Sequence, residues 1–289
     1  MKPLRAYLLL LFAAVSWGSG FAVTKGTLDQ LSPYLIMVLR FGMATLVMLP
    51  FVYKRLRAAS DRIWRIGLPI GIFVFFGHLF QFSGLQYITA GKSAFLSAVY
   101  VVLVPLIVWL LRGAKPSWQN ITACCMCLIG VGVISLDSSL TAGIGEVMTL
   151  AGGICFAMQI ACISRYAEGC DMIVITWISV AVSAVCSLFT LPLVDWQTVS
   201  LSAQGIMSTA YLAVFCSALA FSAQYTGLKY AAPAIGAILL SLESVFGCLT
   251  GVLFLNEAVS ERMLVGCVII LASLLLGSVS GKKSNVKDT

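Results

Sequence analysis

Two ionisable side chains, Glu243 and Arg40, fall inside long apolar stretches of the sequence, where a charge is costly. Glu243 lies ten residues into the stretch 233–255, and an unpaired carboxylate at that depth must be protonated or find a partner. As a functional group it would bind a proton or a substrate amine, and as a structural group it would be a protonated, hydrogen-bonded carboxyl. Arg40 could bind an anion, pair with an acid such as Glu243, or extend outward to water, and we favour the outward orientation.

Further polar and aromatic side chains within apolar stretches could line a cavity. They are Trp17, His78, Gln81, Tyr100, Gln159 and Gln224. His78 and Gln81 are three residues apart and therefore share one face of a helix. Trp17 stands among small residues, which fits either tight helix packing or an aromatic cavity wall. Gln159 is a candidate of the same kind, and Tyr100 continues a mildly polar face with Ser93 and Ser97.

The composition indicates which elements must position these side chains. Sixty per cent of the 289 residues are apolar, 10% are charged, and the mean hydropathy is +1.02. Soluble proteins carry roughly 45–50% apolar and about 25% charged residues. The sequence therefore predicts an all-α integral membrane protein, whose outer surface faces lipid.

Apolar segments of spanning length predict ten transmembrane helices. Their ranges are 4–24, 33–53, 66–85, 92–111, 117–136, 145–164, 172–193, 204–226, 233–255 and 263–280. We expect a first unit of five helices over 1–137, a second over 145–281, and a cytoplasmic tail over 282–289. Pro105 could mark a kink in the fourth helix.

Basic residues predict the orientation of these helices. With both termini in the cytoplasm, fourteen Lys and Arg residues fall on the inner side, against Lys25, Lys92 and Arg262 on the outer side. Cytoplasmic loops collect Lys and Arg, so this bias favours a multi-pass protein of the cytoplasmic membrane with both ends inside. The net charge of +7 follows from this bias and indicates no nucleic-acid partner.

The two halves of the chain resemble each other. A shift of 143 residues lays 81–128 over 224–271 without a gap and matches a Gln-x-x-Gly-Leu-x-Tyr block. Because each half has five spans, the second must be inverted relative to the first, an arrangement typical of transporters with a substrate site near the midplane. The shift pairs Gln81 with Gln224 and Tyr100 with Glu243. The two glutamines should face each other in a central cavity, or else bind neighbouring helices.

Glycines share the helical face of Glu243, at Gly236, Gly247 and Gly251. Such a face either packs tightly against another helix or lines a narrow passage, and the Gly-x-x-x-Gly spacing is more typical of packing.

Several function classes find no support in the sequence. Nine of the ten cysteines lie in apolar runs, so we expect Cys124-Cys125-Met126-Cys127 to pack a helix rather than bind metal, and we expect no cofactor. Motifs of hydrolases, metalloproteases and ATP-binding domains are missing, so any active transport must be secondary. A multi-span membrane enzyme and a non-transporting scaffold or sensor remain the alternatives.

The residues resemble the drug/metabolite transporter superfamily, in its ten-helix EamA-like family. The matching blocks are Trp17-Gly18-Ser19-Gly20-Phe21, Lys25, Leu39-Arg40-Phe41, Gly84-Leu85-Gln86-Tyr87, Phe95-Leu96, Val104-Pro105-Leu106, Gly227-Leu228-Lys229-Tyr230, Glu243 and Phe254-Leu255-Asn256-Glu257. The resemblance implies an exporter of amino acids, other small metabolites or drugs, with a central cavity that opens alternately to each side. It leaves open the substrate, the coupling ion, which could be the proton, and the oligomeric state.

The chain departs from the family pattern at two places. Ser244 stands where the family often has proline after the glutamate, which bears on the mobility of the ninth helix. Arg112-Gly113-Ala114-Lys115 replaces the acidic turn that the first half often carries, so that only Glu257 preserves this feature.

Overall fold

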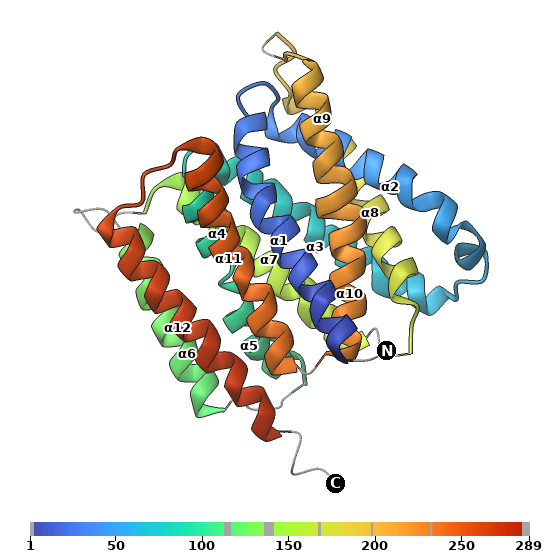
Figure 1. Ribbon diagram of the computed structural model, residues 1–289. Coiled ribbons are helices and arrows are strands. Elements are labelled where there is room, and N and C mark those ends of the chain that lie inside the picture. The colour runs from blue at the N-terminus through green and yellow to red at the C-terminus, as the bar shows by residue number, and fades with distance from the viewer. Residues whose placement is uncertain are drawn as a thin grey trace.

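The computed structural model describes residues 3–112, 117–135, 142–166, 169–197, 199–231 and 233–284. Helices make up nearly all of these ranges (Figure 1). The elements are α1 (Pro3–Thr27), α2 (Pro33–Arg57), α3 (Asp61–Leu85), α4 (Ala90–Ser97), α5 (Tyr100–Arg112), α6 (Trp118–Ser135), α7 (Ile144–Tyr166), α8 (Met172–Leu188), η1 (Leu191–Leu193), α9 (Ala203–Tyr211), η2 (Leu212–Leu219), α10 (Ala220–Tyr230), α11 (Pro233–Leu255) and α12 (Glu261–Ser284).

Within the described ranges, six helical segments are long and apolar enough to cross a membrane. They are Leu4–Thr27, Pro33–Arg57, Asp61–Leu85, Ala90–Leu110, Ile144–Ser164 and Ala203–Tyr230. Shorter apolar helices lie at Trp118–Ile134, Met172–Leu188 and Leu239–Leu255. The chain is therefore a helical membrane protein, while the count of ten spans stays a prediction.

Helix ends follow local sequence signals. Ser32, Thr89, Asp171 and Ser202 each accept a hydrogen bond from a backbone N–H in the first turn of α2, α4, α8 and α9. Such N-caps satisfy donors that the helix itself leaves without partners. Basic residues occupy the last turn of α2, where they favour the negative end of the helix dipole.

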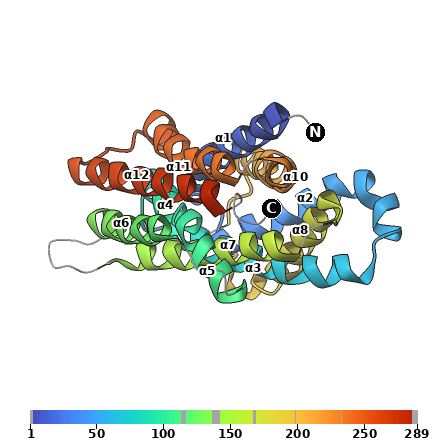
Figure 2. The same cartoon turned by 90° about the horizontal axis from the view of Figure 1, so that it is seen from below.

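Helices distant in the sequence pack in pairs. Both views place α6 beside α12 at one end of the molecule and α2 beside α8 at the other (Figures 1 and 2). Between these ends, α3 packs on α7 and α8, α1 packs on α10 and α11, and α4 packs on α11. This arrangement encloses a centre to which both halves of the chain contribute.

The run from Ala90 to Arg112 is interrupted. A turn at Ala98 and Val99 separates α4 from α5, whereas Pro105 lies inside α5. The interruption therefore lies six to seven residues before the proline at which we expected a kink. Broken helices are tolerated in membranes where the irregular backbone is buried in protein, and Ala98 and Val99 are buried.

A π-helical segment, η2, replaces one stretch of regular α-helix between α9 and α10. The wider turns of a π-helix shift the register of the backbone carbonyls, and such segments are frequent at functional sites. No pattern in the sequence predicted it.

The glycines on the Glu243 face pack closely. A Cβ atom at Gly247 would collide with Ala94 of α4, and one at Gly18 of α1 would collide with Phe246. These contacts confirm the packing interpretation for Gly247. The expected departure at Arg112–Lys115 falls largely on residues 113–116, which lie outside the described residues.

Candidate functional site

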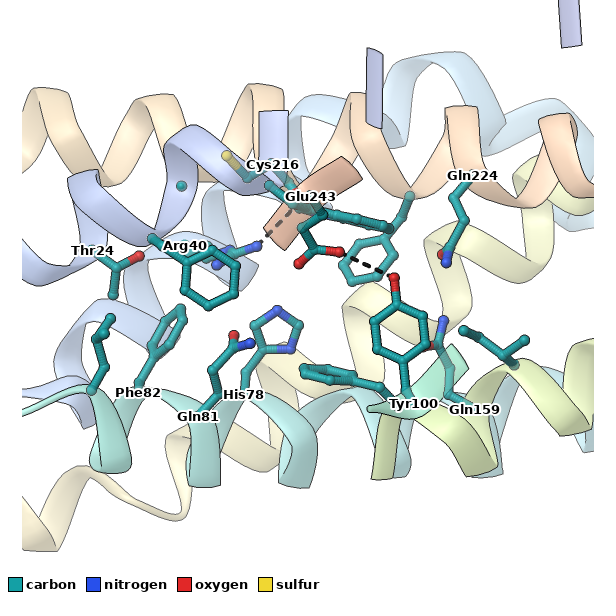
Figure 3. Close-up of a pocket in the computed structure, with 17 residues that line it drawn as sticks. Thr24, Arg40, His78, Gln81, Phe82, Tyr100, Gln159, Cys216, Gln224 and Glu243 are labelled. Carbon is teal, nitrogen blue, oxygen red and sulfur yellow. Dashed lines mark hydrogen bonds between the residues drawn. The ribbon is translucent and has the colours of Figure 1, made fainter. Parts of the chain in front are cut away.

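A central pocket lies between helices of the two halves (Figure 3). Its walls come from α1, α2, α3 and α5 of the first half and from α7, η2, α10 and α11 of the second. All eight side chains that the sequence singled out line it: Trp17, Arg40, His78, Gln81, Tyr100, Gln159, Gln224 and Glu243. The structure therefore brings these residues together, while their role in binding or coupling stays a prediction.

Glu243 is bound by its counterpart in the other half. The Tyr100 hydroxyl donates a hydrogen bond of 3.1 Å to Glu243 Oε2, and both side chains are buried (Figure 3). The hydroxyl supplies a partner that a carboxyl group needs away from water. One bond from a neutral group does not neutralise a carboxylate, so Glu243 keeps the capacity to hold a proton or a cationic ligand.

Arg40 does not extend outward, and this part of the prediction was wrong. Only 3% of the residue is exposed. Its Nε donates to Ser217 Oγ at 2.7 Å and its Nη2 donates to the Cys216 carbonyl oxygen at 3.2 Å. The guanidinium also lies 5.5 Å and 5.4 Å from the ring centroids of Phe41 and Phe82. Fixed bonds and aromatic faces replace water around the guanidinium, so it stays inside.

Arg40 has no acidic partner among the described residues. The ion pairs found there are Arg55 with Asp171 and Lys92 with Glu146, and none of these four residues lines the pocket. The ion pair between Arg40 and Glu243, which the sequence offered as an alternative, is therefore not formed. A guanidinium has five N–H donors, so Arg40 retains donors for an anionic ligand.

The two glutamines differ in their partners. Gln81 Nε2 donates to Ser97 Oγ at 2.9 Å, which ties α3 to the end of α4. The Gln224 amide oxygen is buried and has no protein partner. Gln81 thus combines both predicted roles, because it lines the pocket and binds a neighbouring helix.

Aromatic rings form much of the remaining wall. The His78 ring meets four phenylalanine rings edge-on, and its Nδ1 donates to the Val74 carbonyl oxygen of its own helix at 2.8 Å. The Trp17 indole N–H donates to the Cys216 carbonyl oxygen at 2.7 Å. Gln159 Nε2 donates to the Tyr225 hydroxyl at 2.7 Å. Trp17 is therefore a cavity wall on a helix whose Gly18 packs tightly.

Some lining residues were missed. Phe156 and Phe221 each lie three residues before a lining glutamine, so helical periodicity could have found them. The Cys216 carbonyl and the Ser217 hydroxyl, which hold Arg40, had no sequence signal because their orientation depends on η2. Within the described part of the chain no three His, Cys, Asp or Glu side chains are grouped to hold a metal ion.

Comparison with known proteins supplies the family. The model of the EamA-like transporter family matches residues 4–136 and again 143–279. The chain belongs to the EamA-like transporter family. The family model matches the chain twice in tandem, in agreement with the resemblance between the two halves of the sequence at a shift of 143 residues.

Relatives of this EamA-like chain carry transporter names. An uncharacterized transporter of Archaeoglobus fulgidus is 30% identical over 96% of this chain and 87% of its own length. The uncharacterized transporter YvbV of Bacillus subtilis is 23% identical over 96% and 93%, and protein PecM of Dickeya dadantii is 25% identical over 92% and 89%. A solved crystal structure with 18% identity superposes with a TM-score of 0.71 over 96% of this chain and 98% of its own, which shows a shared fold. The chain is a membrane transporter.

Proposed function

We propose that the protein is a secondary transporter that exports amino acids or other small metabolites or drugs across the cytoplasmic membrane by alternating access. The observation that carries the proposal is the pocket between the halves, where the equivalent residues Tyr100 and Glu243 are joined by a hydrogen bond. A site held by both halves is alternately exposed when the halves rock against each other.

Ten spans in two inverted five-helix repeats are part of this proposal. Under the 143-residue shift, α3 corresponds to the α9–α10 run and α4–α5 to α11. The packing supports such symmetry, because α3 packs on α7 as α10 packs on α1, while α4 packs on its own counterpart α11 and α6 on α12. The start of α1 and the end of α12 lie at the same end of the bundle (Figure 1). That placement agrees with an even number of spans.

Charged groups suggest what the pocket handles. Arg40 offers donors without an acidic partner, which fits an anionic group on the substrate. Glu243 offers an acceptor that can bind a proton or an amine. We therefore assign substrate binding to Arg40 and coupling to Glu243.

Flux measurements test the proposal. A thermal-shift screen of purified protein against a metabolite panel finds ligands, since a ligand that binds only the folded state raises its stability. Radiolabelled ligand should then enter proteoliposomes saturably and should not enter protein-free liposomes. Binding without flux would favour a scaffold or sensor, and chemical conversion of the ligand would favour a membrane enzyme. Either result would overturn the proposal.

A further inference from the structure

Among the described residues that line the pocket, Gln224 alone has a fully buried side-chain polar atom, its amide oxygen, without a hydrogen-bond partner. The residue is 2% exposed, and its amide points toward Tyr100 and Gln159 at one end of the pocket (Figure 3). A buried carbonyl oxygen without a hydrogen bond destabilises the folded protein. Buried polar groups have hydrogen-bond partners in the great majority of cases, so the unpaired amide oxygen of Gln224 needs an explanation.

The internal symmetry of the chain is broken beside Gln224. Gln81, the counterpart of Gln224, donates to Ser97 Oγ. The 143-residue shift carries Ser97 onto Leu240, which has no hydrogen-bonding group and packs in an apolar cluster with Ala220 and Ala223. The second half therefore keeps the glutamine and has lost the serine, so the Gln224 amide lacks the partner that its counterpart has, and its buried oxygen is bound by no other protein group.

The surroundings define what such a molecule carries. An amide oxygen only accepts hydrogen bonds, and the carboxylate of Glu243 is a second acceptor on the same side of the pocket. Phe221, three residues before Gln224, supplies an aromatic wall. We propose that Gln224 is a specificity residue that accepts a hydrogen bond from an N–H group of the ligand, so that the pocket selects amines with an aromatic or apolar body. This inference deepens the proposed transport function and rests on it for its biological meaning.

The symmetry provides a matched pair of variants for a ligand-free test. Gln224→Leu removes an unsatisfied oxygen and should raise the melting temperature of the purified protein by about 2–4 °C. Gln81→Leu adds the same leucine but deprives Ser97 of its donor, and should lower the melting temperature. A Gln224→Leu variant that is no more stable than wild type would mean that the amide is already satisfied in the empty protein, and would overturn the inference.

A pair of probes tests the ligand class. Tryptamine carries an ammonium group with N–H donors, and its N,N,N-trimethyl derivative keeps the charge without any donor on that nitrogen. Wild type should bind tryptamine about tenfold more tightly than the derivative in concentration-dependent thermal shifts. Gln224→Leu should lose this preference, while Leu253→Ala, at an exposed position outside the pocket, should keep it. Equal affinity of wild type for both probes, or no binding of either, would overturn the inference.

These outcomes are separable from the transport proposal. The stability and binding measurements use detergent-purified protein and need no flux. A transporting protein whose probe preference survives Gln224→Leu would refute the role of Gln224 alone. Selective amine binding without flux would refute transport and leave the binding assignment intact.

Discussion

At the scale of single residues, Glu243 shows how a membrane protein keeps an acid in its interior. Its carboxyl group has the Tyr100 hydroxyl as a hydrogen-bond partner and lies in a pocket rather than against lipid. An ionised acid at the bilayer centre costs on the order of 2.5–3.5 kcal/mol. A glutamine would keep the hydrogen bond without this cost, so the retained acid is best explained by a proton or a cation that it binds in the transport cycle.

We therefore expect Glu243→Gln to fold like wild type but to lose coupling to the proton gradient. One coupled proton and a gradient of one pH unit can drive up to about tenfold accumulation of substrate. That ratio should fall to about one in Glu243→Gln, and Glu243→Asp should retain part of it. Leu253→Ala, an exposed position on the same helix, serves as the control. Proteoliposome flux with and without a pH step measures the effect, and an equal response in wild type and Glu243→Gln would assign Glu243 a structural role.

Ser217 should matter to stability because it binds a buried charge. Ser217→Ala leaves Arg40 Nε without its 2.7 Å acceptor. Hydrogen bonds to charged groups contribute about 1.5–3 kcal/mol, so we expect a loss of that size. The matched control is Ser222→Ala in the same helical run, whose hydroxyl donates only to the Ala218 carbonyl oxygen of its own helix. Thermal unfolding of the two variants should separate them, and similar stabilities would mean that Arg40 has found other partners.

Residue-scale prediction succeeded where the physics is local and failed where it depends on tertiary contacts. A polar or aromatic side chain in an apolar run can be recognised in the sequence, and all eight candidates chosen in this way line one pocket. The orientation of Arg40 was predicted wrongly because its acceptors, Ser217 and the Cys216 carbonyl, lie about 177 residues away on a π-helical segment. The sequence contained no sign of that geometry.

At the scale of elements, apolar run length was sufficient to locate the helices. Each predicted range falls on one helix or on consecutive helical segments, with ends that differ by a few residues, and the ranges 92–111 and 172–193 each contain a turn. The turn at Ala98 and Val99 and the π-helical segment η2 were not predictable from the sequence. Both lie within apolar stretches whose amino-acid composition is the same as that of the regular α-helix on either side. Both irregular segments lie next to the pocket.

Glu257 joins two elements from different halves. Its carboxylate accepts hydrogen bonds from Ala90 N at 2.6 Å and Gly91 N at 3.1 Å, and so caps the start of α4 from the end of α11. The symmetric contact is impossible, because the counterpart of Ala90 is Pro233, which has no N–H, and the counterpart of Glu257 is Ala114. The departure of the first half from the family's acidic turn thus coincides with the loss of an N–H donor that such an acid would bind.

This contact predicts a stability effect. Glu257→Ala should lower stability by about 0.5–2 kcal/mol, the range of a lost helix cap. Asp29→Ala, an exposed acid near the end of α1, should change it by less than about 0.5 kcal/mol. Thermal unfolding in one detergent compares the two. Equal effects would show that the Glu257 bonds contribute nothing beyond the loss of a surface charge.

At the scale of the whole molecule, the distribution of charged residues predicts the orientation of the bundle in the membrane. In the proposed ten-span arrangement, fourteen Lys and Arg residues would fall on the inner side and three on the outer side. In the structure, Lys54, Arg55 and Arg57 gather in the exposed last turn of α2, at a helix end that would face the cytoplasm. Basic side chains near span ends are retained on the cytoplasmic side, so these residues should hold the orientation.

Reporter fusions test this orientation directly. Fusions after Thr289 and within the 54–65 loop should read as cytoplasmic, and fusions within the 137–145 loop should read as external. The expectation follows from the charge bias and from the even number of spans that places both termini on one side. A matched check replaces Lys54, Arg55 and Arg57 with glutamine, which should weaken the orientation without changing the number of helices. A C-terminus that reads as external would refute both the ten-span count and the inversion of the second half, since an odd number of spans would then be required.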